Sequence, residues 1–154
     1  MLKKIFTVIL FLILSSCGYE ATHSKKKSST YDFSINELIF VGDRNINLKI
    51  KQKLNRYTQI KRDKNFKLKI SSKTEKVVIA KDSFGDPTDF KITTIINVEV
   101  LMKNNFKNYL QIVEDFSYNN INNKFDLKGY EREIRNNLAE TATDKLIYKL
   151  SNIQ

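Results

Sequence analysis

FKITTIINVEVLM, residues 90–102, is the stretch that decides the fold. Apolar side chains and a threonine alternate along it and share one face of an extended chain: Phe90, Ile92, Thr94, Ile96, Val98, Val100 and Met102. The residues between them are mostly polar: Lys91, Thr93, Ile95, Asn97, Glu99 and Leu101. This two-residue period predicts a long strand that buries one face in a core.

Strands are also predicted on both sides of this segment. One covers about residues 66–79, where Phe66, Leu68 and Ile70 alternate with lysine and serine. The other covers about residues 107–119, with these residues in phase: Leu110, Ile112, Phe116 and Tyr118. A loop over residues 80–89, with the only proline of the chain, and a turn at residues 103–105 connect the strands. Three consecutive strands with short connections form an antiparallel meander.

Two amphipathic helices complete the pattern. The first spans about residues 45–57, and Asp43 or Asn45 can cap its start. The second spans about residues 127–150, with Asp126 as a cap and an apolar residue at every fourth position. The apolar residues are Ile46, Ile50, Leu54 and Tyr57 in the first helix and Tyr130, Ile134, Leu138, Ala142, Leu146 and Leu150 in the second.

A strand over about residues 31–41 precedes the first helix. Its end, Leu38 to Val41, is an apolar run that predicts burial on both faces. The element order is therefore β-α-β-β-β-α. It predicts an α/β (α+β) fold, a two-layer sandwich in which two helices pack on one face of a four-stranded mixed sheet. We expect the other face of the sheet to be polar.

The chain begins with MLKKIFTVILFLILSSCGY, residues 1–19, which has the pattern of a bacterial lipoprotein signal. Lys3 and Lys4 form a basic start, an apolar run follows over residues 5–14, and small residues precede Cys17. The apolar run is about half the length that a transmembrane helix needs. An ordinary secretory signal is the alternative, but the only cysteine of the chain stands where a lipobox requires one.

Three segments follow from this signal. Residues 1–16 are predicted to be the signal peptide, residues 17–30 a lipidated flexible tether, and residues 31–154 the sandwich domain. Acyl chains on Cys17, the predicted lipid-attachment site, would hold the protein on a membrane. Gly18 stands where an aspartate commonly signals retention in the inner membrane, so we predict the periplasmic face of the outer membrane. The single histidine, His23, lies in the polar tether and is not predicted to bind a metal.

The mature chain is basic. Removal of 16 residues leaves 138 of the 154, which fits one domain, and 25 of the 27 basic residues remain against 17 acidic ones. This excess predicts an anionic partner such as a phospholipid surface or a phosphorylated lipid, while export from the cytoplasm argues against nucleic acid. With Cys17 acylated, no cysteine remains for a disulfide or a thiolate metal site.

No arrangement of residues in the sequence predicts catalysis. Glu114 and Asp115 are neighbours in a strand and point to opposite faces, so they cannot act on one substrate together. The sequence has no Gly-rich phosphate loop, no pair of histidines and no Gly-x-Ser-x-Gly motif. Asp82, Asp86 and Asp89 share a loop but miss the spacing of an EF-hand. We therefore predict a protein that is not an enzyme and that has no cofactor and no metal site.

Lysines surround the loop between the second and third predicted strands. They are Lys73, Lys76, Lys81 and Lys91, and they flank SFGDP at residues 83–87. This arrangement predicts a basic rim around an exposed aromatic side chain, Phe84, where a lysine can bind a phosphate as a point charge. The alternative is that a lysine-rich chain carries lysines on all its surfaces.

Several segments together match one family in the order of elements. They are Ser-Cys-Gly-Tyr at residues 16–19, the strand and helix through Leu54, the strand over residues 90–101, and YEREIRNNLAE at residues 130–140 in the final helix. In these features the chain resembles the lipopolysaccharide-assembly lipoprotein family LptE, over nearly the whole mature chain. The Lys/Ser-rich segment after Tyr19 departs from the more apolar approach of many members.

The resemblance implies a sandwich that plugs the outer-membrane barrel LptD of the lipopolysaccharide translocon, assists its assembly and binds lipopolysaccharide through basic residues near a sheet-edge loop. On this chain those residues would be Lys76, Lys81 and Lys91. Two other functions stay open. An envelope lipoprotein that serves as a binding module accessory to another transport system can share such a fold. A periplasmic hydrolase would need clustered, buried carboxylates.

Overall fold

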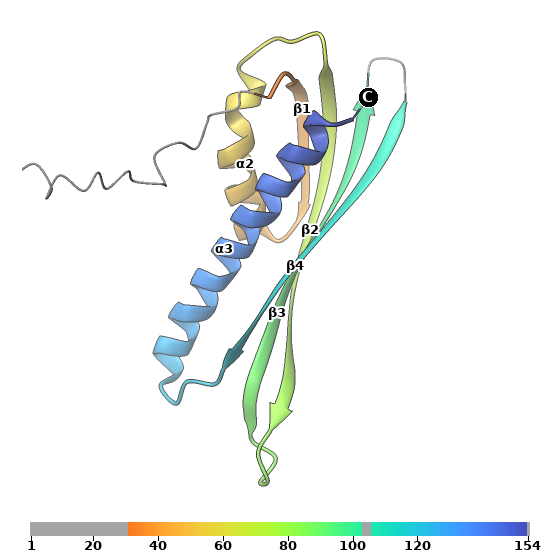
Figure 1. Ribbon diagram of the computed structural model, residues 1–154. Helices are drawn as coiled ribbons and strands as arrows, with labels where there is room; N and C mark the ends of the chain where they lie inside the picture. Colours follow the sequence, from red (N-terminus) through yellow and green to blue (C-terminus); the bar gives the residue numbers. More distant parts are fainter. Residues whose placement is uncertain (1–30, 103–105, 154) are drawn as a thin grey trace, which may run out of the picture. The chain divides into compact units, whose positions relative to one another are not determined.

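The computed structural model describes residues 31–102 and 106–153. The elements follow in the order β1 (Ser34–Gly42), α2 (Arg44–Thr58), β2 (Asn65–Lys81), β3 (Pro87–Met102), β4 (Lys107–Asn119) and α3 (Lys124–Ser151) (Figure 1). The predicted order of elements and the predicted fold class are confirmed. The predicted signal, Cys17, the tether with His23, and the turn at residues 103–105 lie outside the described residues.

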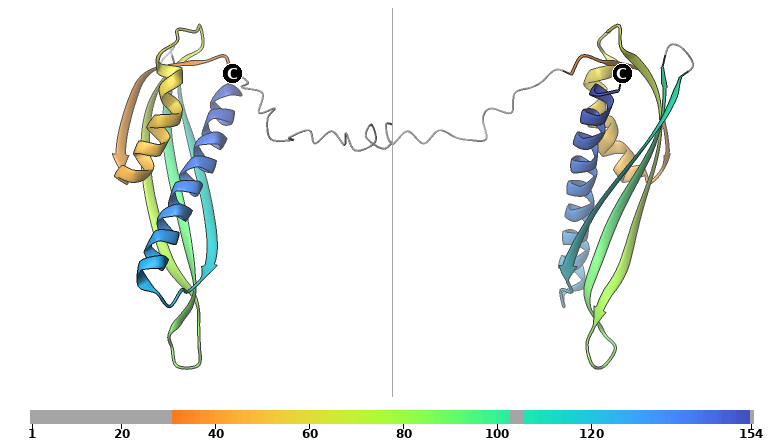
Figure 2. Two further views of the ribbon diagram at one scale, coloured as in Figure 1. Left: turned by 90° about the vertical axis from the view of Figure 1, so that its left-hand side faces the viewer. Right: turned by 45° about the vertical axis from the view of Figure 1, so that its right-hand side comes forward.

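The four strands form one mixed sheet in the order β1-β2-β3-β4. β1 runs parallel to β2, and β2, β3 and β4 form the antiparallel meander that the sequence predicts. Both helices cover the same face of the sheet, which we call the inner face (Figure 2). Ile70 pairs with Val98, and Ile96 pairs with Ile112, so the inward side chains of neighbouring strands stand side by side.

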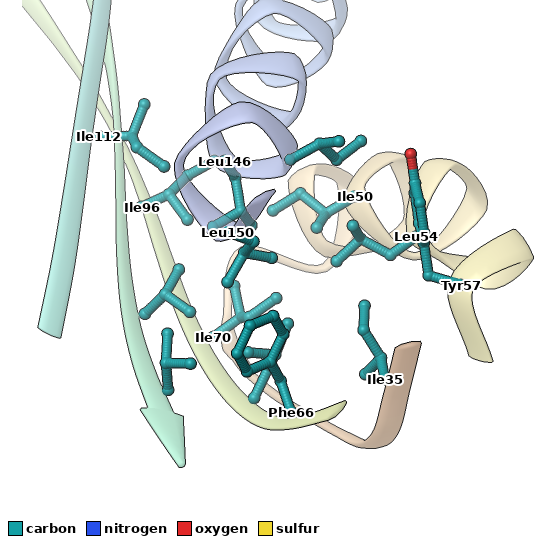
Figure 3. Packing of buried hydrophobic residues seen from close by; sticks show 14 of the residues in the cluster. Ile35, Ile50, Leu54, Tyr57, Phe66, Ile70, Ile96, Ile112, Leu146 and Leu150 are labelled. Carbon is teal, nitrogen blue, oxygen red and sulfur yellow. The ribbon is translucent and has the colours of Figure 1, made fainter. Parts of the chain in front are cut away.

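The larger core lies between the sheet and both helices. Fully buried side chains fill it: Ile50 and Leu54 from α2, Leu146 and Leu150 from α3, and Phe66, Ile70 and Ile96 from the sheet (Figure 3). Phe33 stacks on Tyr57 with ring centroids 4.5 Å apart, and both rings are buried. Full burial of one such aliphatic side chain stabilises the fold by about 1.5–3 kcal/mol. Apolar packing is therefore the main source of stability here.

A smaller core has α3 as its only helix. Its members are Phe90, Ile92, Tyr118, Ile134 and Leu138. Between the two cores, Thr74 pairs with Thr94 across β2 and β3. Within the described part of the chain, neither threonine hydroxyl has a hydrogen-bond partner. Polar groups thus interrupt the inner face between the two cores.

The end of β1 is not buried on both faces, contrary to the prediction. Ile39 and Val41 are 46% and 50% exposed, because both helices lie on the opposite face of the sheet. The outer face is also less polar than expected, since Tyr109 and Val113 are exposed on it. Phe116 faces inward, in phase with the buried residues of β4, yet it is 46% exposed because β4 is an edge strand.

Side-chain oxygens cap both helices. Asp43 caps α2 as predicted, because its Oδ1 accepts the backbone N–H groups of Asn45 at 2.9 Å and Ile46 at 3.2 Å. α3 begins one turn earlier than predicted, because Asn123, and not Asp126, accepts the N–H of Phe125 at 2.9 Å. Among the described residues, no helix is both long enough and apolar enough to span a bilayer.

Candidate ligand-binding site

The hairpin of β2 and β3 projects beyond β4 and ends in a short ordered turn (Figure 1). The connection runs only from Asp82 to Asp86, so it is shorter than the predicted loop over residues 80–89. Asp82 Oδ1 accepts the backbone N–H groups of Phe84 and Asp86, each at 2.9 Å, and Gly85 supplies the left-handed backbone with a φ of 90°. The turn holds Phe84 91% exposed, as the sequence predicts.

The three predicted ligand lysines are not brought together around this turn. Lys81 is exposed at the end of β2. Lys91 pairs with Val77 on the outer face, whereas Lys76 pairs with Ile92 on the inner face. The strand register therefore separates Lys76 from Lys91, and no single rim contains all three.

Lys76 is engaged inside the domain. Its Nζ donates a hydrogen bond to Glu131 Oε1 at 2.5 Å and lies 3.8 Å from the ring centre of Phe90. The hydroxyl of Tyr118 donates to the same carboxylate oxygen at 2.8 Å, and Arg135 Nη2 lies 3.4 Å from Glu131 Oε2. Glu131 is only 7% exposed. A buried carboxylate with three such partners has little remaining capacity for a ligand.

The pKa values in this cluster follow from its hydrogen bonds. Burial alone would raise the pKa of Glu131, but the hydrogen bonds from Lys76 and Tyr118 and the charges of Lys76 and Arg135 outweigh burial and hold the pKa below its ordinary value. Burial, and then the hydrogen bond to Glu131, raise the pKa of Tyr118 well above its ordinary value. At neutral pH Glu131 is therefore an anion and Tyr118 a neutral phenol. The cluster ties α3 to the sheet and offers no group ready to exchange a proton.

Other acidic side chains are dispersed. Glu114 and Asp115 point to opposite faces, as predicted: Glu114 Oε1 lies 2.6 Å from Lys145 Nζ, while Asp115 pairs with Thr93 on the outer face. Within residues 31–102 and 106–153, no three His, Cys, Asp or Glu side chains lie close enough together to hold a metal ion.

A groove of about 560 Å³ lies between the first half of α2 and the first part of α3. Four cationic side chains line it: Lys49 from α2, and Lys128, Arg132 and Arg135 from α3. Ile46 and Leu48 give part of the lining an apolar character, and the amides of Asn45, Gln52 and Asn136 add hydrogen-bond donors. We call this feature the interhelix groove.

The interhelix groove is not among the sites predicted from the sequence. Neither Lys49 nor the three cations of α3 have a predicted role. The sequence does contain one indication of the groove. Lys128, Arg132 and Arg135 are spaced by four and three residues, so they share one helix face. The sequence does not reveal that this face adjoins Lys49, because that depends on how the helices pack.

The comparisons with known proteins give structural relatives. No protein-family model matches the chain, and no curated protein matches it in sequence. Rare lipoprotein B from Shewanella oneidensis is 12% identical, with a TM-score of 0.55 over 76% of this chain and 98% of that chain. Lipoprotein B from Nitrosomonas europaea is 12% identical, with a TM-score of 0.57 over 79% and 86%. A minor lipoprotein from Acinetobacter baumannii is 10% identical, with a TM-score of 0.56 over 79% and 91%.

The described domain has the fold of these solved bacterial lipoproteins. The likeness covers most of each chain. At 10–12% identity it shows a common fold. The function of this chain therefore has to be argued from its own residues.

Proposed function

We propose that this chain is an outer-membrane lipoprotein subunit of the lipopolysaccharide translocon. In this function it assists assembly of the LptD barrel, plugs the barrel and binds lipopolysaccharide for delivery to the cell surface. The observation that carries the proposal is a domain with the fold of solved bacterial lipoproteins in a chain with a lipobox at Cys17. The excess of basic residues suits a ligand that bears phosphates.

Exposed apolar side chains on the outer face of the sheet support the proposal that a large protein partner binds there. Ile39, Val41, Tyr109 and Val113 are exposed there, from β1 and β4 at the two edges of the sheet. A protein that covered this face would remove these apolar side chains from water. The wall of the LptD barrel is the partner that we propose for this face.

Lys81 and Lys91 are the lysines that we propose for direct contact with lipopolysaccharide. Within the described residues neither has an ion-pair partner, whereas Lys76 is bound to Glu131. Lys76 would then act indirectly, by fixing the inner side of the hairpin.

The Lys81→Ala variant tests the ligand part of the proposal. We expect lipopolysaccharide binding to weaken about two- to fivefold without loss of folding, because an exposed ion pair contributes up to about 1 kcal/mol. A matched control is Lys61→Ala, an exposed lysine between α2 and β2, which should bind as the unaltered chain does. Equal binding by Lys81→Ala and the unaltered chain would remove the hairpin tip from the ligand site.

Co-purification tests the translocon part. The full chain, extracted in detergent and captured through a tag at its C-terminus, should bring down a large outer-membrane β-barrel protein in stable association. Capture without any barrel protein would contradict the proposal.

A Cys17→Ala variant tests the anchor. Without the thiol no acyl chain can be attached, so the protein should leave the outer-membrane fraction and appear in the soluble periplasmic fraction. Ser16→Ala, which keeps Cys17, serves as the control and should stay with the outer membrane. An outer-membrane fraction that retains Cys17→Ala in full would show that lipid does not hold the chain.

A second candidate function is a binding module accessory to another envelope transport system. The observation that favours it is the separation of Lys76 from Lys91, because this leaves no concentrated basic rim at the hairpin tip. A common fold is compatible with either function. Capture of transporter subunits in place of a barrel protein would identify this second function.

A further inference from the structure

The interhelix groove gathers positive charge on the helical side of the domain, away from the outer face of the sheet. We propose that it is a binding site for a phosphate monoester or diphosphate group, held by Lys49, Lys128, Arg132 and Arg135. The proposal does not rest on the translocon function, because it uses only groups that line the groove.

The charge balance of the groove favours an anion. Two carboxylates, Asp43 and Glu131, also line it. Asp43 accepts two backbone N–H groups at the start of α2, and Glu131 is bound by residues of its own cluster. In the part of the chain that the structure describes, Lys49, Lys128 and Arg132 form no ion pair. Four cations against two carboxylates leave an excess of positive charge in the groove, and a multivalent anion would reduce the repulsion between the cations.

The helices that carry the cations are joined to each other next to the groove. Lys53 of α2 binds α3 through Asp144 Oδ1 at 2.7 Å and Glu140 Oε1 at 3.2 Å, so the two helices are joined next to the groove. Arg135 is oriented by Glu131 Oε2 at 3.4 Å. A ligand would therefore meet cations whose supporting helices are already positioned, which lowers the ordering cost of binding.

The types of residue that line the groove favour a phosphate group as the ligand. One arginine guanidinium can donate two parallel hydrogen bonds to two oxygens of a phosphate, and lysine adds a point charge. The amides of Asn45, Gln52 and Asn136 can donate to further oxygens. A single carboxylate has only two oxygens and one charge, so it would leave most of these donors and cations without a partner. Ile46 and Leu48 are suited to contact the apolar part of a molecule that carries the phosphate.

Calorimetric titration of the full chain tests the proposal. The chain is kept in micelles of a neutral detergent and titrated first with inorganic pyrophosphate and then with the same micelles doped with phosphatidic acid. The test variant is Lys49→Ala with Arg132→Ala. The control is Lys51→Ala with Lys61→Ala, which removes two exposed lysines that do not line the groove. Thermal melting verifies that both variants fold.

Binding of pyrophosphate that weakens at least about tenfold in the test variant, but less than about twofold in the control, would support a site for free phosphate groups. The same pattern with phosphatidic acid alone would also support the site and would assign its ligand to a lipid headgroup. If neither compound binds, or if the two variants lose affinity equally, the proposal is overturned. Loss of barrel co-purification would leave these outcomes unaffected, so this test is separate from that of the translocon function.

Discussion

Different kinds of side chain separate the inner face of the sheet from solvent in the larger and in the smaller core. Where α2 and α3 both cover the sheet, aliphatic side chains fill the larger core. In the smaller core, where α3 is the only helix, the apolar residues are joined by the Lys76–Glu131 pair with Tyr118 and Arg135. The side chain of Lys76 is 32% exposed, so its stem packs on Phe90 while its charge remains near water. In the smaller core α3 alone does not cover the sheet completely, and the charged cluster around Glu131 fills the part that would otherwise be open to solvent.

The largest effect should come from the larger core. Leu54→Ala removes a fully buried side chain between α2 and the sheet and should lower the free energy of unfolding by about 2–5 kcal/mol. Urea unfolding of the full chain measures the loss. Leu48→Ala is the matched control, because Leu48 lies on the same helix and is 47% exposed, and it should cost less than about 1 kcal/mol. Equal losses would mean that α2 does not contribute to the core as described.

A smaller effect should come from the charged cluster. Glu131→Gln keeps the shape of the side chain but removes its charge, so Lys76 and Tyr118 lose a strong acceptor. We expect a loss of about 1–3 kcal/mol in the free energy of unfolding. Glu133→Gln, at an exposed position of the same helix, should change it by less than about 0.5 kcal/mol. Indistinguishable unfolding curves for the two variants would contradict the role of Glu131.

The smallest effect concerns pH. The pKa of Glu131 lies below its ordinary value of 4.5 in the folded state, so its contribution to stability is complete above pH 4.5 and is lost as the pH falls through the folded pKa. The difference in unfolding free energy between the unaltered chain and Glu131→Gln should therefore shrink as the pH is lowered below 4.5. Urea unfolding at a series of pH values measures it. A difference that stays constant or grows in acid would show that Lys76 does not hold the carboxylate charged.

Local patterns in the sequence predict most of the elements. The alternation predicts the buried face of β3 from Phe90 to Val100, and Met102 at its end is only partly buried. The four-residue period of α3 predicts its packing face from Ile134 to Leu150, whereas Tyr130, which the same period includes, is 37% exposed. Both signals act within one element, where the two-residue or 3.6-residue period is set by the backbone. The order of elements then leads to the mixed sheet.

The errors concern relations between elements. The apolar run in β1 does not indicate that both helices will cover one face, so the exposure of Ile39 and Val41 was missed. The pairing of β2 with β3 decides that Lys76 faces α3 and Lys91 faces outward, and a strand register depends on distant packing. Lys76 and Glu131 are 55 residues apart in the chain, and only the folded domain brings them together. The interhelix groove likewise depends on how α2 and α3 pack.

Depletion of the protein in the bacterium that makes it tests the central claim most directly. Lipopolysaccharide on the cell surface is measured together with the amount of assembled LptD barrel. A translocon subunit predicts that both fall as the protein is depleted. Unchanged surface lipopolysaccharide with a normal amount of barrel would contradict the account and would favour an accessory function in another transport system.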